Sequence, residues 1–218
     1  METTVVQEPE VAAAVVLRTT ADGRSDVIVT GPRTRGSYHP SRPTPVCVRM
    51  MLPPGHARAA LRVPVSTLVD RAVRLADLWG DEGRRLTGEL LADPSRLAEV
   101  FGGRGDPAVT AAIGALSESA GLGEASGRAG VSERYLRTLF AREVGLSPKH
   151  FARISRVRRV LSLAGRERWA AVADAAGYFD QAHMIGDFRS VMGVSPGAYV
   201  SGRLPATTPC LTLRASAG

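Results

Sequence analysis

Two groups of polar side chains in the C-terminal half of the sequence are chemically suited to reading flat surfaces that offer several hydrogen-bond acceptors and donors. In the first group, Arg134 and Arg137 each carry a planar guanidinium fork that could bind two acceptors on a guanine edge, or grip a phosphate. In the second group, the amide of Gln181 matches the edge of adenine, and Ala182 or Ile185 could contact a thymine methyl group. These residue types favour contacts to bases if the fold exposes both groups.

The elements that must position these side chains are predicted by an internal repeat with an offset of 48 residues. Each copy has a small residue on a short helix, then a turn, a helix N-cap, a helix of about three turns and a glycine stop. This order predicts a helix-turn-helix, twice. The paired residues are Ala125 and Ala173, Ser132 and Asp180, Leu136 and Met184, Phe140 and Phe188, Val144 and Met192, Gly145 and Gly193, Ser147 and Ser195, Pro148 and Pro196, and Phe151 and Tyr199.

An apolar stripe in the longer helix of each copy decides which side chains point outward, because it recurs at the spacing of a buried helix face. His183 is as well suited to packing or hydrogen bonding inside the protein as to reading a base. The buried stripes are Leu136, Leu139, Phe140 and Val144 in the first copy, and Met184, Phe188, Val191 and Met192 in the second. The candidates for DNA contact are Ser132, Glu133, Arg134, Arg137, Thr138, Asp180, Gln181, Ala182, His183, Ile185 and Arg189.

A continuous helical pattern over residues 149–164 connects the two copies. Such a helix is roughly 24 Å long at 1.5 Å per residue. Successive major-groove faces of B-DNA recur every ~34 to 36 Å, so the connector could hold both units against one side of a duplex. Lys149, Arg153 and Arg156 on this helix are candidates for phosphate contact, with salt bridges to neighbouring helices or a solvated basic face as the alternatives.

Composition and charge agree with this reading without requiring it. The chain has 218 residues, of which 44% are hydrophobic and 22% charged, as in an ordinary globular protein. Its net charge is +7, and most of the excess lies after residue 105, which suits a polyanion but also follows from an arginine-rich composition. No apolar stretch approaches the roughly 20 residues of a bilayer span, and residues 11–17 follow acids rather than a basic region. We expect a cytoplasmic protein without a membrane partner.

The run of glycines from Gly102 to Gly105, followed by Asp106 as N-cap and Pro107, predicts a domain boundary. Upstream, residues 12–17, 26–30 and 46–52 are β-prone, and a helix is expected from Ser66, with further helical segments over 86–91 and 96–101. The predicted fold is α+β overall: a small α+β N-terminal domain over residues 1–105, an all-α domain over 106–204 that begins with a helix after Asp106, and a disordered tail over 205–218.

On these residues the C-terminal part resembles the AraC/XylS family of transcriptional regulators. The resemblance covers about 95 residues, although Gly186 and Val160 stand where the family often has an arginine and an alanine. It implies a bihelical DNA-binding domain and transcription regulation. The residues that carry it are Gly130–Ser132, Leu136, Arg137, Phe140, Gly145–Pro148, Arg156, Ala173, Ala176–Met184, Asp187–Arg189 and Gly193–Pro196.

The N-terminal part resembles the cupin-like sensor segment that precedes this domain in many family members, through residues 22–28, 31–32, 52–56 and 78–80. It is shorter at its N-terminus than the family pattern. The resemblance implies double-stranded DNA as a partner, a small-molecule effector of unknown identity, and RNA polymerase contact, and it leaves a homodimer open.

Other classes of function have weaker support in the sequence. No nucleophile elbow, phosphate-binding loop or zinc-protease motif occurs, and Cys47 has only His39 and His56 near it, so no catalytic residues are expected. The same histidines lack the spacing of a cupin metal centre, and Cys47 and Cys210 lack a C-x-x-C partner, so no metal, cofactor or disulfide is predicted. A non-specific architectural DNA-binding protein remains the alternative, because a basic surface alone would suffice for it.

Overall fold

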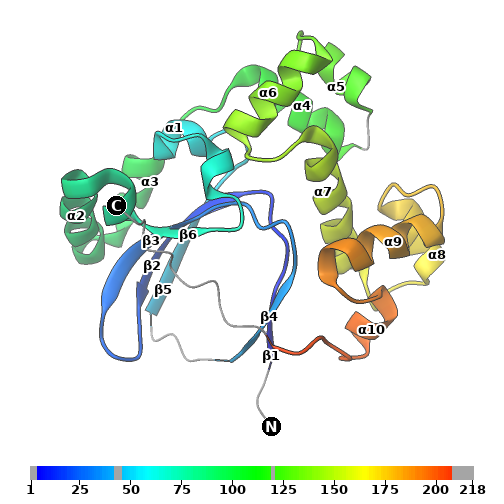
Figure 1. The fold of residues 1–218 in the computed structure, drawn as a ribbon, viewed down its shortest axis with the longest axis horizontal. Coiled ribbons are helices and arrows are strands. Elements are labelled where there is room, and N and C mark those ends of the chain that lie inside the picture. The colour runs from blue at the N-terminus through cyan, green and yellow to red at the C-terminus, as the bar shows by residue number, and fades with distance from the viewer. Residues whose placement is uncertain (1–3, 42–45, 119–120, 208–218) are drawn as a thin grey trace.

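The computed structural model describes residues 4–41, 46–118 and 121–207 (Figure 1). Its N-terminal half contains two small antiparallel sheets, whose strands are short because prolines and a Gly23 turn interrupt the chain. The larger sheet has the order β5-β2-β3-β6, formed by Val46–Leu52, Ala13–Thr19, Ser25–Thr30 and Ala72–Arg74. The smaller sheet pairs β1 (Thr4–Gln7) with β4 (Ser37–Pro40). The strands predicted over 12–17, 26–30 and 46–52 are confirmed as β2, β3 and β5.

Helices cover the larger sheet and bury an apolar cluster against it. Leu61, Leu75 and Phe101 are at most 1% exposed and belong to the same cluster as Val15 and Val29 of the sheet. The helices are α1 (Ala57–Leu61), η1 (Val65–Leu68), α2 (Leu75–Ala92), η2 (Pro94–Arg96) and α3 (Leu97–Phe101). The predicted α+β character is therefore confirmed.

The helix predicted to start at Ser66 is wrong. The chain instead makes the one-turn helix η1, then turns at Asp70, whose φ is +54°, and pairs β6 with β3 before α2 begins at Leu75. Leu68, Val73 and Leu75 are all buried, so the apolar residues serve three different elements rather than one helix face. Pairing with the sheet overrides the local helical spacing.

The C-terminal half is entirely helical where it is described, apart from its connecting turns. Asp106 accepts hydrogen bonds from the backbone N–H groups of Ala108 and Val109, which confirms it as the cap of the first helix. The helices are α4 (Pro107–Ser117), α5 (Leu122–Arg128), α6 (Glu133–Glu143), α7 (Pro148–Leu163), α8 (Trp169–Ala175), α9 (Gln181–Met192) and α10 (Pro196–Val200).

Two apolar clusters stabilise this half, one around each predicted helix-turn-helix. The first contains Leu136 and Phe140 of α6 together with residues of α4, α5 and the start of α7. The second contains Met184 and Phe188 of α9 with residues of α8 and the end of α7, and it also includes Tyr38 of β4. The connector α7 therefore contributes to both cores, and the N-terminal half contributes an aromatic ring to the second.

Three remaining expectations concern the ends and the surface. The predicted tail falls largely on residues 208–218, which lie outside the described part of the chain, as does Cys210. Cys47 on β5 is exposed and carries a free thiol. Across the described residues, the structure contains no helix of the length and apolarity that a membrane crossing requires.

Candidate nucleic-acid interface

The first helix-turn-helix, α5 and α6, exposes the polar face that the sequence predicts. Ser132 is the N-cap of α6, and its hydroxyl accepts a hydrogen bond of 3.3 Å from the backbone N–H of Tyr135. Leu136, Leu139, Phe140 and Val144 are at most 2% exposed, which confirms the buried stripe. The side of α6 that remains open to solvent carries Glu133, Arg134, Arg137 and Thr138.

The two arginines of α6 differ in their surroundings. Arg137 donates to the carboxylate of Glu133 at 2.9 Å, one helical turn earlier, so it would exchange this partner for a base or a phosphate. Arg134 forms no ion pair with any residue that the structure describes. Its guanidinium is therefore available without the loss of an existing interaction.

The second helix-turn-helix, α8 and α9, presents a less charged face. Asp180 caps α9, and its carboxylate accepts a hydrogen bond of 2.7 Å from the backbone N–H of His183. Gln181, Ala182, His183 and Arg189 are exposed, whereas Ile185 is half-buried and packs on the second core. The buried stripe of Met184, Phe188, Val191 and Met192 is confirmed.

His183 stands between the exposed face of α9 and the protein interior. Its ring meets that of Tyr178 edge to face, with 5.2 Å between centroids, and its Nε2 lies 3.9 Å from the carboxylate of Asp187. Burial and the charge of Asp187 raise the pKa of Tyr178 to about 12. The histidine thus makes the intramolecular contacts that the sequence left open, while half of its side chain stays accessible.

Arg153 and Arg156, two of the candidates for phosphate contact, bind a buried acid instead. Arg153 Nε lies 3.0 Å and Arg156 Nη2 3.3 Å from the two oxygens of Asp187, whose side chain is 9% exposed. Arg156 also lies over the ring of Tyr178, 5.0 Å from its centroid. These contacts correspond to the salt-bridge alternative, and they attach the connector α7 to the recognition helix α9.

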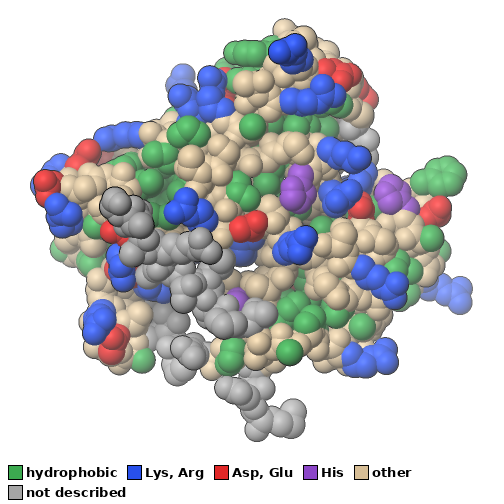
Figure 2. All heavy atoms as spheres, in the orientation of Figure 1, with side chains coloured by type: hydrophobic (Ala, Val, Ile, Leu, Met, Phe, Trp, Pro, Cys, Tyr) green, Lys and Arg blue, Asp and Glu red, His purple; other side chains and the backbone are tan. Residues whose placement is uncertain are grey.

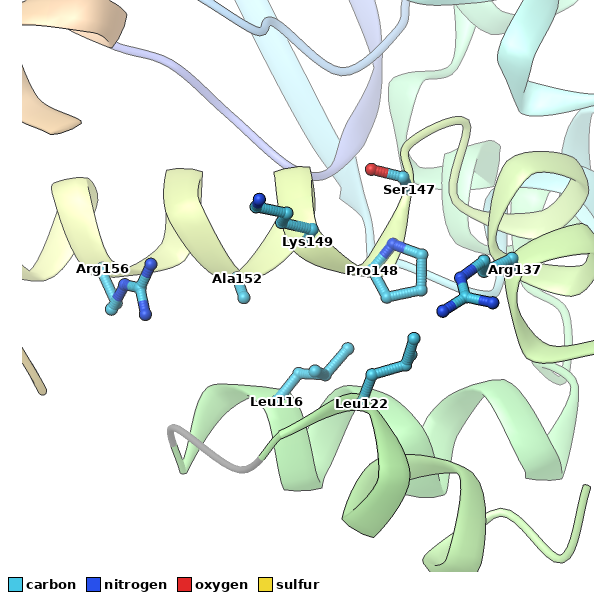
Figure 3. A pocket seen from close by; sticks show the side chains of 8 residues that line it. All are labelled: Leu116, Leu122, Arg137, Ser147, Pro148, Lys149, Ala152 and Arg156. Atoms are coloured by element: carbon cyan, nitrogen blue, oxygen red, sulfur yellow. The ribbon is translucent and has the colours of Figure 1, made fainter. Parts of the chain in front are cut away.

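A groove of about 510 Å³ lies between α7 and the helices α4 and α5, and it brings base-reading and phosphate-binding candidates together (Figure 3). Leu116 and Leu122 form one apolar wall and point toward Pro148 and Ala152 on the other. Three cations line the groove as well: Arg137 from α6, and Lys149 and Arg156 from α7. Of these, Lys149 makes no ion pair with a described residue, so it is the phosphate candidate with the fewest ties to the protein.

Basic side chains follow the helical half along one edge of the view, from the region of α5 and α6 past α7 to α9 and α10 (Figure 2). The same region contains His150, whose pKa is lowered by burial and by the positive charge of Arg153. Acidic side chains also occur there, so the surface is mixed rather than uniformly positive. No group of three metal-binding side chains occurs among residues 4–41, 46–118 and 121–207.

Sequence reasoning assigned no anchoring role to three residues that fix these helices: Glu143, Asp187 and Tyr38. Asp187 had a visible signal, because it is an acid on the buried side of α9 facing a connector rich in arginine. Glu143 lies beyond the last exposed candidate of α6 and reads as an ordinary surface residue. Tyr38 is more than 100 residues from its partners, and no local pattern indicates such a contact.

A family model described as "Helix-turn-helix domain" matches residues 125–202, which span both units and the connector. No curated protein matches the chain. Among solved structures, the C-terminal domain of AraT, a response regulator from Geobacillus stearothermophilus, is 24% identical and covers 46% of this chain and 89% of its own, with a TM-score of 0.43.

Two further solved structures are distant likenesses of the fold. The DNA-binding domain of the global transcriptional factor AdpA, in complex with a target DNA, is 24% identical over 44% of this chain and 92% of its own, with a TM-score of 0.42. Fatty-acid-bound ToxT from Vibrio cholerae is 12% identical over 94% of both chains, with a TM-score of 0.45.

Residues 125–202, with the capped helices α6 and α9 and the shared connector α7, therefore form a helix-turn-helix domain. The domain before it is rich in β-strands.

Proposed function

We propose that this protein is a sequence-specific DNA-binding transcriptional regulator of the AraC type, and that it inserts α6 and α9 into successive major grooves on one side of a duplex. Each helix reads a separate half site. The observation that carries the proposal is the exposure of equivalent N-terminal faces on two helices that share one connector, α7. Recognition helices of this motif contact base edges with their N-terminal residues, where the capped ends of α6 and α9 lie.

The two faces are assigned different chemistry within this proposal. Arg134 and Arg137 bind guanine edges or phosphates, and Gln181 binds adenine, with Ala182 and Ile185 near thymine methyl groups. The residues that flank these readers are Ser132, Glu133, Thr138, Asp180, His183 and Arg189. Lys149 contacts the phosphate backbone. Arg153 and Arg156 engage it less directly, because Asp187 already binds them.

The boundary near residue 105 and the partners beyond DNA belong to the same proposal. The β-rich domain over residues 1–105 receives a signal, from a small effector or a partner molecule, and the DNA-binding domain over 106–204 changes promoter occupancy or contact with RNA polymerase in response. Because the proposed partner is genomic DNA, we assign the protein to the cytoplasm. The proposal is compatible with a homodimer formed through the β-rich domain.

Binding to genomic fragments over a series of salt concentrations tests the proposal against non-specific architectural binding. A sequence reader prefers particular fragments at every salt concentration, although all affinities fall as salt rises because counterions are released. An architectural binder has the same salt slope for all fragments and no preferred site. A protein without a preferred fragment at physiological salt contradicts the proposal and supports the alternative.

A further inference from the structure

The N-terminal half contacts equivalent positions of the two helix-turn-helix units, at the C-terminal end of each recognition helix. In the internal repeat, Val144 corresponds to Met192 and Gly145 to Gly193. The chain after α6 and the end of α9 are both held there, by two different parts of the N-terminal half: the α1 and η1 segment at the first unit, and β4 with its preceding loop at the second. The two repeated units are therefore held at equivalent positions by unrelated segments of the N-terminal half.

At the first unit, Arg58 of α1 donates to the carboxylate of Glu143, the last residue of α6, with 3.4 Å between Nη1 and Oε1. The side chain of Glu143 is only 5% exposed. Immediately after α6, Gly145 takes a φ of +82° and passes so close to η1 that an added Cβ would lie 2.9 Å from the carbonyl oxygen of Val65. The close approach fixes the distance between η1 and the end of α6.

At the second unit, two donors of the N-terminal half bind the last carbonyl groups of α9, which a helix leaves unpaired. The backbone N–H of Gly36 donates to Val191 at 2.9 Å, and the hydroxyl of Tyr38 donates to Met192 at 2.7 Å. The Tyr38 side chain lies within the core of this unit and is 4% exposed. Burial and then the nearby Tyr199 raise the pKa of Tyr38 to about 12, so its phenol keeps the proton that it donates.

None of these contacts covers the faces proposed to read DNA. Glu133, Arg134, Arg137 and Thr138 remain exposed on α6, as do Gln181, Ala182, His183 and Arg189 on α9. The N-terminal half therefore holds both helices from their far ends without blocking their N-terminal ends. An arrangement that suppressed DNA binding by steric cover would bury at least one of these faces.

We propose that Tyr38 and Arg58 are positioning residues that fix the two recognition helices relative to each other, and that they thereby set the half-site spacing that the regulator accepts. This inference rests on the proposed function, because a spacing preference requires two reading units. Without the contacts of Tyr38 and Arg58, each unit still binds its own half site. The pair of units then also accepts half sites at other separations.

The experiment uses the full chain and duplexes that the wild-type protein selects from a random-sequence library. Binding is compared for the selected duplex, for the same duplex with one base pair inserted between the half sites, and for each half site alone. The variants are Tyr38→Phe, Arg58→Gln and both together. Arg85→Gln is the matched control, since Arg85 pairs with Glu89 at 2.8 Å within α2, away from both units. Thermal unfolding verifies that each variant is folded.

We expect the double variant to lose at least about fivefold of the discrimination against the inserted base pair, the lower end of ordinary coupling between sites. Binding to single half sites and the behaviour of Arg85→Gln should stay unchanged. Unaltered discrimination in the double variant overturns the inference, and so does tighter binding to every duplex, which would mean that the N-terminal half inhibits. A wild-type protein that selects no paired half sites overturns the proposed function and this inference with it.

A distance measurement without DNA distinguishes failure of this inference from failure of the proposed function. Spin labels at Ala141→Cys on α6 and Ala170→Cys on α8, with Cys47 and Cys210 replaced by serine, report the distance between the units. The inference requires a narrow distance distribution in the wild-type background that broadens with Tyr38→Phe and Arg58→Gln. Equal distance distributions in the wild-type and variant proteins would overturn the inference, even if the protein binds DNA sequence-specifically.

Discussion

The two helix-turn-helix units have the same sequence pattern, but the buried acid on each recognition helix pairs with arginines from different elements. In the first unit, Glu143 binds Arg142 at 2.9 Å and Arg58 of the N-terminal half at 3.4 Å. In the second, Asp187 binds Arg153 and Arg156, both on the connector α7. The ion pairs of the first recognition helix therefore reach the N-terminal half, whereas those of the second stay within the C-terminal half, and the second contacts the N-terminal half through the hydrogen bonds of Gly36 and Tyr38. A repeat conserves the helices and caps, while the neighbours of each copy determine its ion pairs.

Substituting the proposed base readers tests whether the two units act on separate half sites. Arg134→Ala and Gln181→Ala should each cost about 1 to 3 kcal/mol at one base position, because a bidentate contact is lost there and nowhere else. Competition binding with singly substituted duplexes measures this, and the two affected positions should lie in different half sites. An equal loss of affinity for all sequences would instead fit phosphate contacts or an architectural binder.

Removing the buried charges tests the difference in anchoring. Asp187→Asn should lower the free energy of unfolding by about 2 kcal/mol, because two arginines lose a shared, nearly buried partner. Glu143→Gln should cost about 1 kcal/mol, since both of its arginine partners are 44% exposed and regain water. Urea unfolding of the full chain provides both values. A larger loss for Glu143→Gln would reverse the comparison.

The N-caps offer a smaller contrast between the same helices. Asp180→Ala and Ser132→Ala should each destabilise the protein by about 1 kcal/mol, as lost caps usually do. The effect at Asp180 should be the larger, because its hydrogen bond is shorter, 2.7 Å against 3.3 Å, and its negative charge faces the positive end of the helix dipole. Asp180→Asn keeps the cap and removes the charge, so thermal unfolding of this variant isolates the dipole contribution.

The smallest expected effect concerns His150 at the start of α7. Burial, followed by the charge of Arg153, lowers its pKa in the folded protein. The unfolded chain therefore binds more protons than the folded protein between that lowered pKa and the ordinary value of about 6.5, and stability should rise with pH across this window. His150→Gln should flatten this part of a plot of unfolding free energy against pH. A wild-type slope of the opposite sign would contradict the assignment.

The helical half could be predicted closely because its signals are local. Ser132, Ser147, Asp180 and Ser195 all cap helices as expected, and Gly145 and Gly193 end the preceding segments with positive φ. A cap and a stop act within a few residues, so each can be recognised in isolation. The exposure of the reading faces followed from the same short-range periodicity.

The N-terminal half could be predicted less well because its elements are defined by pairing. The small sheet of β1 and β4 pairs residues 30 or more positions apart, and neither strand has a pattern long enough to recognise alone. The spacing of Leu68, Ala72 and Leu75 imitates a helix face, although the three residues belong to η1, β6 and α2. The anchoring roles of Asp187 and Tyr38 were not predicted for a related reason: their partners lie on other elements.

The presence of Tyr38 in the core of the second unit limits how the gene can be rearranged. Joining residues 106–204 to a foreign partner domain would leave that unit without one of its aromatic rings and would leave the Met192 carbonyl without the phenol that binds it. Such a fusion should therefore lower the stability of the second unit unless the incoming domain supplies a comparable buried ring. The two halves of this chain are therefore not structurally independent modules.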